Sequence, residues 1–367
     1  MKLFFPPSAT PDEAQWRSWR WQLSHAVRTL PGAESMLGLS PGALDALAPT
    51  AARYPIFATP YYLSLAQSPS LEDPVLRQCL PDNAEIRDQD GGGPDALDEG
   101  RCSPVPRLVH RYPDRALFIT GNLCAVHCRH CMRKRDWAVA LPPPSADELS
   151  AAAAYLRAHP GVREVLISGG DPLMLPEESL SQVIEVFSAV PSVEMLRFGT
   201  RVPVVLPQRI TPQLAALLAS GKPAWVATHF NHPQEITAES REAAGILSRH
   251  GIGLVNQSVL LKGVNDSAAV LGRLFTSLLA MHIKPYYLFH GDPITGAMHF
   301  RTGVKAGLEI MDELRGRISG MALPAFAFDL PGGAGKIRLQ PEHVIRHDES
   351  GAPVFMSYEG REVAYRN

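Results

Sequence analysis

Three of the five cysteines in this chain lie within eight residues, at Cys124, Cys128 and Cys131, in C-x3-C-x2-C spacing. An odd cluster cannot pair completely as disulfides, and a closed tetrahedral zinc site requires four ligands. Three thiolates suit a four-iron cluster, because the fourth iron then stays free for a small ligand. The spacing alone leaves a zinc knuckle or a group of reactive thiols as the alternative.

A second candidate for chemistry is Lys336, which follows the glycine-rich run from Asp329 to Gly335. The run is not a phosphate-binding P-loop, because Leu330 stands at the first glycine position and Ile337 replaces the required Ser or Thr. A lysine on a glycine hinge can form a Schiff base with the aldehyde of pyridoxal phosphate (PLP). A solvated surface lysine is the simpler interpretation of Lys336 taken alone.

The phosphate of such a cofactor would need cations, and a group of suitable residues precedes the first expected strand. Arg111 and Arg115 offer guanidinium groups, and Tyr112 lies between them with a hydroxyl. Arginine binds phosphate through two parallel hydrogen bonds. We therefore expect these three residues to bind the cofactor phosphate.

Polar clusters follow three of the expected strands. They are Ser168-Gly169-Gly170-Asp171-Pro172, Thr228-His229-Phe230-Asn231-His232 and Asn256-Gln257-Ser258. The glycines would let backbone approach a ligand, and Asp171 could accept from a ligand ammonium group. Each cluster alone is explained equally well as an ordinary turn. Three clusters on one face of a sheet favour a ligand pocket.

The elements that must position these residues alternate between strand-like and helix-like segments, which predicts an α/β fold with a parallel sheet. Ser145 with Glu148 forms a capping box, Thr211-Pro212 starts a helix, and Thr237 precedes another that stops at Gly251. Six βα units are too few for an eight-stranded barrel, so we predict a partial (βα)6 barrel open on one side, with a doubly wound open sheet as the alternative. The expected strands lie near 116–120, 164–168, 194–198, 224–229, 253–257 and 284–289.

Three segments are expected along the chain. Residues 1–105 form an N-terminal helical and irregular region, whose last part, from about 81, is a glycine-rich acidic loop or linker. Residues 106–322 form the core barrel. Residues 323–367 carry the lysine loop and a β-rich cap, which we expect to cover the open barrel. Cys79 and Cys102 are expected to be thiols without a role.

Composition limits the partners. The chain has 367 residues, of which 45% are hydrophobic, and 35 Lys and Arg nearly balance 37 Asp and Glu. No overall field draws such a protein to nucleic acid or to a membrane, so the partner expected is a small molecule. The sequence has no run of about twenty apolar residues and no secretory signal. A reducing, cytoplasmic location is expected, which suits free thiolates.

The cysteine loop, behind the apolar run Leu117–Ile119, resembles that of radical S-adenosylmethionine (SAM) enzymes. Over roughly residues 50 to 365 the chain resembles the PLP-dependent lysine 2,3-aminomutase family. In this order the stretches that carry the resemblance are highly specific: HRYPDRALFIT, CAVHCRHCMRKR, VLISGGDPL, RFGTRVPVVLPQRIT, THFNHPQEIT, NQSVLLKGVND, KPYYLFHGD and DLPGGAGK.

The resemblance implies a role for each matching residue. It makes the three cysteines the ligands of a [4Fe-4S] cluster, whose fourth iron is chelated by SAM. It makes Lys336 the lysine that holds PLP, Arg133 the partner of the substrate carboxylate, and Asp292 and Asp329 the partners of the substrate's side-chain ammonium. The PLP contacts implied are Arg111, Tyr112 and Arg115, and the residues implied on the SAM side are His130, Gly169, Gly170, Asp171, His229 and Gln257.

The reaction implied is an isomerisation, in which the amino group of L-lysine moves from C2 to C3 to give β-lysine, with an electron donor for the cluster. The same chemistry on arginine, glutamate or a lysine derivative is the alternative, and so is a non-catalytic metal-binding scaffold. The chain departs from the family in two places. Ser267 replaces a zinc-binding cysteine and the tail has no cysteine, so any homo-oligomer is expected to lack interfacial zinc. Ala334 replaces a glycine of the lysine loop, which should matter little unless its φ is positive.

Overall fold

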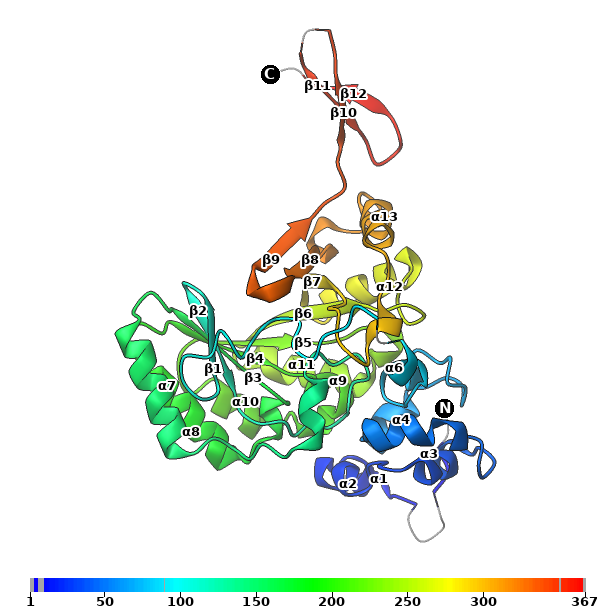
Figure 1. Ribbon diagram of the computed structural model, residues 1–367, viewed down its shortest axis with the longest axis vertical. Coiled ribbons are helices and arrows are strands. Elements are labelled where there is room, and N and C mark those ends of the chain that lie inside the picture. Colours follow the sequence, from blue (N-terminus) through cyan, green and yellow to red (C-terminus); the bar gives the residue numbers. More distant parts are fainter. Residues whose placement is uncertain (1–2, 6–9, 89, 350, 366–367) are drawn as a thin grey trace.

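The computed structural model describes residues 3–5, 10–88, 90–349 and 351–365. It has a helical N-terminal region, a barrel-like sheet with helices on its outer side, and a small C-terminal sheet at the far end of the molecule (Figure 1). The N-terminal region contains the short helices α1 (Glu13–Trp16), α2 (Trp19–Ser24), α3 (Leu30–Leu37), α4 (Ala48–Arg53), α5 (Pro60–Ser64) and α6 (Ala84–Arg87).

Within the described residues, the barrel-like sheet has nine strands that lie side by side in the order of the sequence. Strands β2 to β8 are parallel, while β1 and β9 pair antiparallel at the two ends. The strands are β1 (Leu108–Tyr112), β2 (Arg115–Ile119), β3 (Glu164–Ser168), β4 (Met195–Gly199), β5 (Ala224–Thr228), β6 (Gly253–Leu260), β7 (Lys284–His290), β8 (Ala325–Leu330) and β9 (Gly335–Leu339).

Crossover helices connect the parallel strands, and their first residues carry the expected signals. Ser145 forms a capping box with Glu148, and Thr211 and Thr237 cap their helices through hydroxyl oxygens, as predicted. The helices are α7 (Ala146–Ala158), α8 (Glu177–Ser188), α9 (Val202–Val205), α10 (Pro212–Leu218), α11 (Ala238–Arg249), α12 (Ala268–Leu279) and α13 (Val304–Leu314).

The alternation of side chains along each strand separates the core from the site. On β3, Val165 and Ile167 are fully buried, whereas Leu166 and Ser168 line a cavity on the other face. The core between sheet and helices is apolar and closely packed, and the rings of Phe118 and Phe187 meet edge to face at 4.9 Å. Burying one such side chain contributes about 1.5–3 kcal/mol, so this layer fixes the positions of the strand ends.

The six strands predicted from the sequence are present in the predicted order, and the parallel run continues with a seventh. Strand β8 follows α13 as a further crossover unit and pairs parallel with β7. The segment that we expected to begin at 323 as lysine loop and cap therefore begins inside the sheet. Strand β8 was missed because it leads directly into the glycine-rich turn, so the sequence analysis assigned the strand and the turn together to the lysine loop.

The C-terminal strands form the small antiparallel cap that was expected, from β10 (Val344–His347), β11 (Pro353–Met356) and β12 (Glu362–Ala364). This sheet projects away from the barrel (Figure 1), and among the described residues none beyond Arg338 lines the cavity. The expectation that it covers the open barrel is therefore not met. Strands β8 and β9 extend the sheet on the side that six strands would have left open.

The N-terminal region packs on the barrel through polar contacts. The hydroxyl of Tyr62 donates to Glu235 at 2.8 Å, and the hydroxyl of Thr59 donates to the carbonyl of Val205 at 2.8 Å. Residues 90–103, here called the connecting segment, run from α6 toward β1. This segment bonds to the loop after β7, because Gly93 N–H donates to the carbonyl of Pro293 at 2.9 Å. No helix among the described residues has the length and apolar character needed to cross a bilayer.

Candidate active site

A cavity of about 590 Å³ lies inside the barrel and at the carboxyl ends of its parallel strands. This is the end at which parallel α/β barrels place their sites. Every site residue predicted from the sequence lines this cavity: Arg111, Tyr112, Arg115, Cys124, Cys128, His130, Cys131, Arg133, Gly169, Gly170, Asp171, His229, Gln257, Asp292, Asp329 and Lys336.

The three cysteines lie on the loop that follows β2. Burial, together with Asp171 and the neighbouring cysteines, holds the pKa of the Cys124 thiol well above its ordinary value, and burial raises the pKa of Cys131 to about 11. A metal must therefore displace protons from these thiols on binding. Among the described residues no three His, Cys, Asp or Glu side chains converge on one point as ligands of a single ion. The thiols of a four-iron cluster bind three different irons, so thiols spread along one loop fit it.

Buried charges hold this loop in place. Glu85, from α6, accepts from Arg129 Nη2 at 2.6 Å and from Lys134 Nζ at 2.5 Å. Lys134 Nζ also donates to the carbonyls of Arg129 and Gly296, at 2.9 and 2.7 Å. Burial lowers the pKa of Lys134 to about 8, although Glu85 opposes that shift. All three side chains are almost completely buried, so the loop is fixed by charges that have no access to the cavity.

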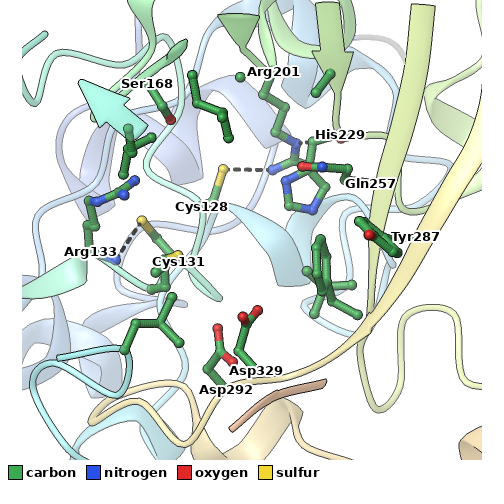
Figure 2. A pocket seen from close by; sticks show the side chains of 18 of the residues that line it. Cys128, Cys131, Arg133, Ser168, Arg201, His229, Gln257, Tyr287, Asp292 and Asp329 are labelled. Carbon is green, nitrogen blue, oxygen red and sulfur yellow. Dashed lines mark hydrogen bonds between the residues drawn. The ribbon is translucent and has the colours of Figure 1, made fainter. Parts of the chain in front are cut away.

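Arg201, at the end of β4, connects the cysteine loop to the N-terminal region. Its Nη1 donates to Cys128 Sγ at 2.8 Å (Figure 2), and its Nη2 donates to Glu235 at 2.7 Å and Gln78 at 2.5 Å. The same Nη2 lies 2.9 Å from the hydroxyl of Tyr62. Sequence analysis missed Arg201, although it follows a strand end in the same way as the polar clusters that were noticed.

The Gly169-Gly170-Asp171 turn has a structural explanation that differs from the expected one. A Cβ on Gly170 would lie 2.6 Å from the carbonyl carbon of Asn122, so glycine here admits the backbone that leads to the cysteines. The carboxylate of Asp171 accepts from Thr200 Oγ1 at 2.6 Å and from the N–H groups of Leu173, Arg201 and Val202. These four donors occupy its lone pairs, so Asp171 orients the turn after β4 and has no capacity left for a ligand ammonium group.

The two histidines beside the cysteines have free polar atoms. In the described part of the chain, buried Nδ1 of His130 and buried Nε2 of His229 have no hydrogen-bond partner. Burial, followed by the charge of Arg201, lowers the pKa of His229 to about 3 and that of His130 well below its ordinary value. Both imidazoles are therefore neutral. Gln257, on β6, lies beside His229 (Figure 2). Buried polar atoms without partners fit the polar groups of a bound ligand.

At the opposite end of the cavity lie Asp292, Asp329 and Lys336. The two carboxylates lie next to each other (Figure 2), and Lys336 Nζ pairs with Asp329 at 2.6 Å. Burial, and then the charge of Asp329, raises the pKa of Asp292 to about 6. Lys336 Nζ also lies 4.0 Å from the ring centre of Phe289. We call this group, with Arg111, Tyr112 and Arg115 beside it, the aspartate end.

Lys336 is the second residue of strand β9 and follows a turn that needs glycine. Gly332 and Gly333 have φ of 66° and 72°, which side-chain-bearing residues adopt only with strain. Ala334 has φ of −70°, so alanine fits at the position where the family has glycine. The sequence-based expectation that this departure is harmless agrees with the backbone.

The predicted phosphate-binding residues also have unused donors. In the described residues, Nε of Arg111 and the hydroxyl of Tyr112 are buried without hydrogen-bond partners, and Nη2 of Arg111 donates to the carbonyl of Leu97. The guanidinium of Arg115 stacks over the ring of Tyr112 at 3.8 Å and pairs with Asp114 at 2.7 Å. Two cations and a hydroxyl with spare donors fit a phosphate.

Arg133 is not free in this structure, because Glu99 of the connecting segment pairs with it. Nη2 of Arg133 lies 2.5 Å from Glu99 Oε1, and Nε lies 3.1 Å from Oε2. Sequence analysis missed Glu99, since it lies in an acidic, glycine-rich stretch that reads as a linker. No local signal could have found it. A different signal could have found Arg338, which also lines the cavity, because it is two residues after Lys336 on the same strand.

Comparison with known proteins agrees with this geometry. Residues 118–270 match the radical SAM superfamily, and residues 311–367 match a family domain described as lysine-2,3-aminomutase. The barrel and its cysteine loop thus define a radical SAM enzyme. A solved radical SAM methyltransferase from Sphaerobacter thermophilus aligns with a TM-score of 0.43 and 19% identity, over 60% of this chain and 68% of its own.

Curated relatives cover nearly the whole chain. An Aquifex aeolicus protein, whose name proposes L-lysine 2,3-aminomutase activity, is 44% identical over 96% of this chain and 95% of its own. The L-lysine 2,3-aminomutase of Fusobacterium nucleatum is 40% identical over 98% of this chain and 84% of its own. The glutamate 2,3-aminomutase of Clostridioides difficile is 35% identical over 91% of this chain and 79% of its own. The chain belongs to the lysine 2,3-aminomutase family.

Proposed function

We propose that this protein is a PLP-dependent radical SAM aminomutase that moves the amino group of L-lysine from C2 to C3. One observation carries the proposal: the cysteine loop, Lys336 and two adjacent carboxylates all line a single cavity. When bound, the reduced cluster with SAM would supply a hydrogen-abstracting radical, and PLP would supply a π-system that delocalises the unpaired electron while the nitrogen migrates. The relatives named L-lysine 2,3-aminomutase support the same activity.

In this proposal the cluster and SAM occupy one end of the cavity, and PLP occupies the other. Cys124, Cys128 and Cys131 hold the cluster, and His130, His229 and Gln257 contact SAM through polar atoms that face the cavity. Lys336 Nζ holds PLP, and Arg111, Tyr112 and Arg115 bind its phosphate. An external electron donor must reduce the cluster. Excluding water from the space between the two ends would protect radical intermediates.

The substrate would be bound at its two charged ends. Arg133 binds the α-carboxylate, because a guanidinium matches a carboxylate with two parallel hydrogen bonds. Asp292 and Asp329 bind the side-chain ammonium. Asp329 pairs with Lys336 here, at 2.6 Å, and that pairing partner is lost once Nζ carries PLP. Asp329 then accepts from the substrate.

The two carboxylates favour lysine over glutamate. A glutamate side chain would bring a third negative charge against Asp292 and Asp329, and like charges desolvated together cost several kcal/mol. Arginine carries a cation as well, so charge does not exclude it, and only the length of the cavity could distinguish it from lysine. A lysine derivative with a longer side chain could likewise be distinguished from lysine only by the length of the cavity.

The first experiment offers lysine, arginine, glutamate and lysine derivatives to the anaerobically reconstituted protein with SAM, PLP and dithionite. We expect β-lysine as the main product, detected by mass spectrometry. Faster isomerisation of glutamate or arginine than of lysine would contradict the assignment.

A second experiment replaces Asp292 or Asp329 with alanine. Each change leaves one carboxylate to hold the ammonium, so kcat/KM for lysine should fall. The fall should correspond to a loss of about 2–5 kcal/mol in transition-state stabilisation. Asp312→Ala, an exposed carboxylate on α13, is the matched control and should leave kcat/KM unchanged. The pocket assignment fails if both aspartate variants turn over lysine like the unmodified protein.

A third experiment reduces the PLP-loaded protein with borohydride and maps the labelled peptide. The pyridoxyl group should appear on Lys336, and Lys336→Ala should abolish the label. The exposed Lys305 serves as the control, since Lys305→Ala should label normally. Label on a different lysine would overturn the assignment.

We also propose that any oligomer of this chain forms without zinc at the family's position. Ser267 stands there and caps α12, accepting from Val270 N–H at 3.4 Å. A zinc content near zero in protein purified without chelator, measured together with its mass in solution, is the expected result.

A further inference from the structure

Glu99 is the acidic partner of two neighbouring arginines at the edge of the cavity. Its carboxylate accepts from Arg133 through Nε and Nη2, at 3.1 and 2.5 Å, and from Arg135 Nη2 at 3.1 Å. The side chains of Glu99 and Arg133 are only 6% and 13% exposed. Such a bidentate contact fixes both the position and the plane of a guanidinium.

The edge of Arg133 that Glu99 occupies leaves another edge available. A guanidinium presents one hydrogen-bonding edge formed by Nε and Nη2 and another formed by Nη1 and Nη2. Glu99 takes the first edge. On the second, Nη1 has one contact, with the carbonyl of Gly169 at 3.4 Å, which is long for a hydrogen bond. The Nη1 and Nη2 edge can therefore accept a carboxylate while Glu99 stays in place.

The other charges around this pair belong mainly to Arg135. Asp95 lies 3.5 Å from Nη1 of Arg135, and Asp136 lies 3.4 Å from its Nε. Among the described residues, Glu99 is the carboxylate within ion-pair distance of Arg133. Arg135 thus ties Glu99 to Pro94 within the connecting segment, since its Nη1 also donates to the carbonyl of Pro94 at 2.8 Å.

The connecting segment also links the Glu99–Arg133 pair to the aspartate end, at Arg111 and beside Asp292. Arg111 donates to the carbonyl of Leu97, and Gly93 N–H donates to the carbonyl of Pro293, next to Asp292. Glu99 is therefore anchored relative to the residues that would bind phosphate and substrate ammonium. A carboxylate that held Arg133 from a loose loop could not set its distance from Asp292.

We infer that Glu99 is a positioning residue for substrate recognition: it holds Arg133 so that the Nη1 and Nη2 edge meets the α-carboxylate of the amino acid. The inference rests on the proposed function, in which Arg133 binds that carboxylate. It separates two roles within one ion-pair group, with Glu99 acting through Arg133 and Arg133 touching the substrate. The competing interpretation makes Glu99 a stand-in for the substrate carboxylate, which the substrate must displace.

The test compares two ligands that differ by one group. Lysine carries the α-carboxylate, and 1,5-diaminopentane is lysine without it. Binding of each to the cluster- and PLP-loaded protein, without reductant, is measured from the absorbance change of PLP. In Glu99→Gln the Kd for lysine should rise on the order of tenfold, while the Kd for 1,5-diaminopentane stays unchanged. A tenfold rise is the lower end of the effect expected when a hydrogen bond to a charged group is weakened. Glu99→Asp, which keeps the charge, should restore part of the lost affinity.

Two controls accompany the measurement. Glu148→Gln breaks a partly buried ion pair with Arg107, 2.7 Å long and outside the cavity, and should alter neither ligand's Kd. Arg133→Met should raise the Kd for lysine more than Glu99→Gln does, and it should leave the Kd for 1,5-diaminopentane unchanged.

The outcomes separate the inference from the proposed function. If Arg133→Met weakens lysine but Glu99→Gln does not, Glu99 has no positioning role and the function stands. Tighter lysine binding in Glu99→Gln would establish the stand-in role and overturn the inference. Equal weakening of both ligands would show a general structural effect and overturn it as well. If Arg133→Met leaves lysine unaffected, the proposed contact with the carboxylate fails, and the inference fails with it.

Discussion

The cysteine loop and the aspartate end use charged residues in opposite ways. Around the loop, Glu85, Arg129 and Lys134 are buried away from the cavity, and their polar atoms are engaged by one another and by carbonyl groups. At the aspartate end, Arg111 and Tyr112 keep buried donors without partners among the described residues, and Lys336 pairs with Asp329, which a ligand would need. The cysteine loop thus uses completed ion pairs as scaffold, whereas the aspartate end keeps free donors and an ion pair that a ligand could engage.

The largest effect expected is the loss of the cluster. Replacing Cys124, Cys128 or Cys131 with alanine should reduce SAM cleavage to background, because in the proposed cluster each thiolate binds a different iron. The measurements are iron and acid-labile sulfide content and 5'-deoxyadenosine release. Cys102→Ser and Cys79→Ala should retain both. Zinc bound without sulfide in the reconstituted protein would contradict the cluster assignment.

The next effect concerns the scaffold. Glu85→Gln leaves Arg129 and Lys134 without their buried counter-charge, which costs about 3–5 kcal/mol in the free energy of unfolding. The lower end is expected, since Lys134 can lose its proton. Urea unfolding measures the change. Glu177→Gln breaks the pair between Arg209 and Glu177, in which the Glu177 side chain is 52% exposed, and should cost less than about 1 kcal/mol. Equal costs for the two variants would remove the distinction between scaffold charges and exposed ones.

The pKa of Asp292 makes the stability of the aspartate end depend on pH. Its folded-state pKa of about 6 lies above the ordinary 3.8, so the folded protein binds this proton more tightly than the unfolded chain. The contribution of this proton to the free energy of unfolding is fully present below about pH 4. It is lost as pH rises through 6, and the loss is at most about 3 kcal/mol. Asp292→Asn should therefore match the ligand-free protein near pH 4 and become the more stable of the two by pH 7. The exposed Asp312→Asn should give a difference that does not vary over this range.

The smallest effect is on cofactor affinity. Arg111→Ala removes a donor to the proposed phosphate and should weaken PLP binding by about 1.5–3 kcal/mol, with little change in unfolding free energy. Equilibrium dialysis of PLP measures it. Arg107→Ala, outside the cavity, is the control. A large loss of stability in Arg111→Ala would place this residue with the scaffold instead.

Local patterns predicted the parts of this protein that depend on neighbours in sequence. The cysteine spacing, the caps at Ser145 and Thr237 and the six strands follow from patterns a few residues long, and the structure contains them. Strand β8 was missed because a conspicuous turn follows it. Asp171 was expected to bind a ligand because its actual donors could not be seen in the sequence. They are backbone and hydroxyl groups, and three of the four lie about thirty residues away.

Ion pairs between distant segments could not be predicted in this way. Glu85 meets Arg129 across 44 residues and Glu99 meets Arg133 across 34. A single acidic residue in a polar stretch gives no indication of such a partner, since only the folded chain determines which charges become buried together.

The order of the strands has a consequence for how the protein is made. Each strand of the nine-stranded sheet pairs with the strand before it in the sequence, so the sheet can extend step by step as the chain emerges from the ribosome. The cysteine loop follows β2, near the beginning of this growth, whereas Lys336 lies on β9, the last strand to be added. The two halves of the site are therefore completed at the beginning and at the end of the growth of this sheet, and the strand that carries Lys336, the lysine proposed to hold PLP, is added last.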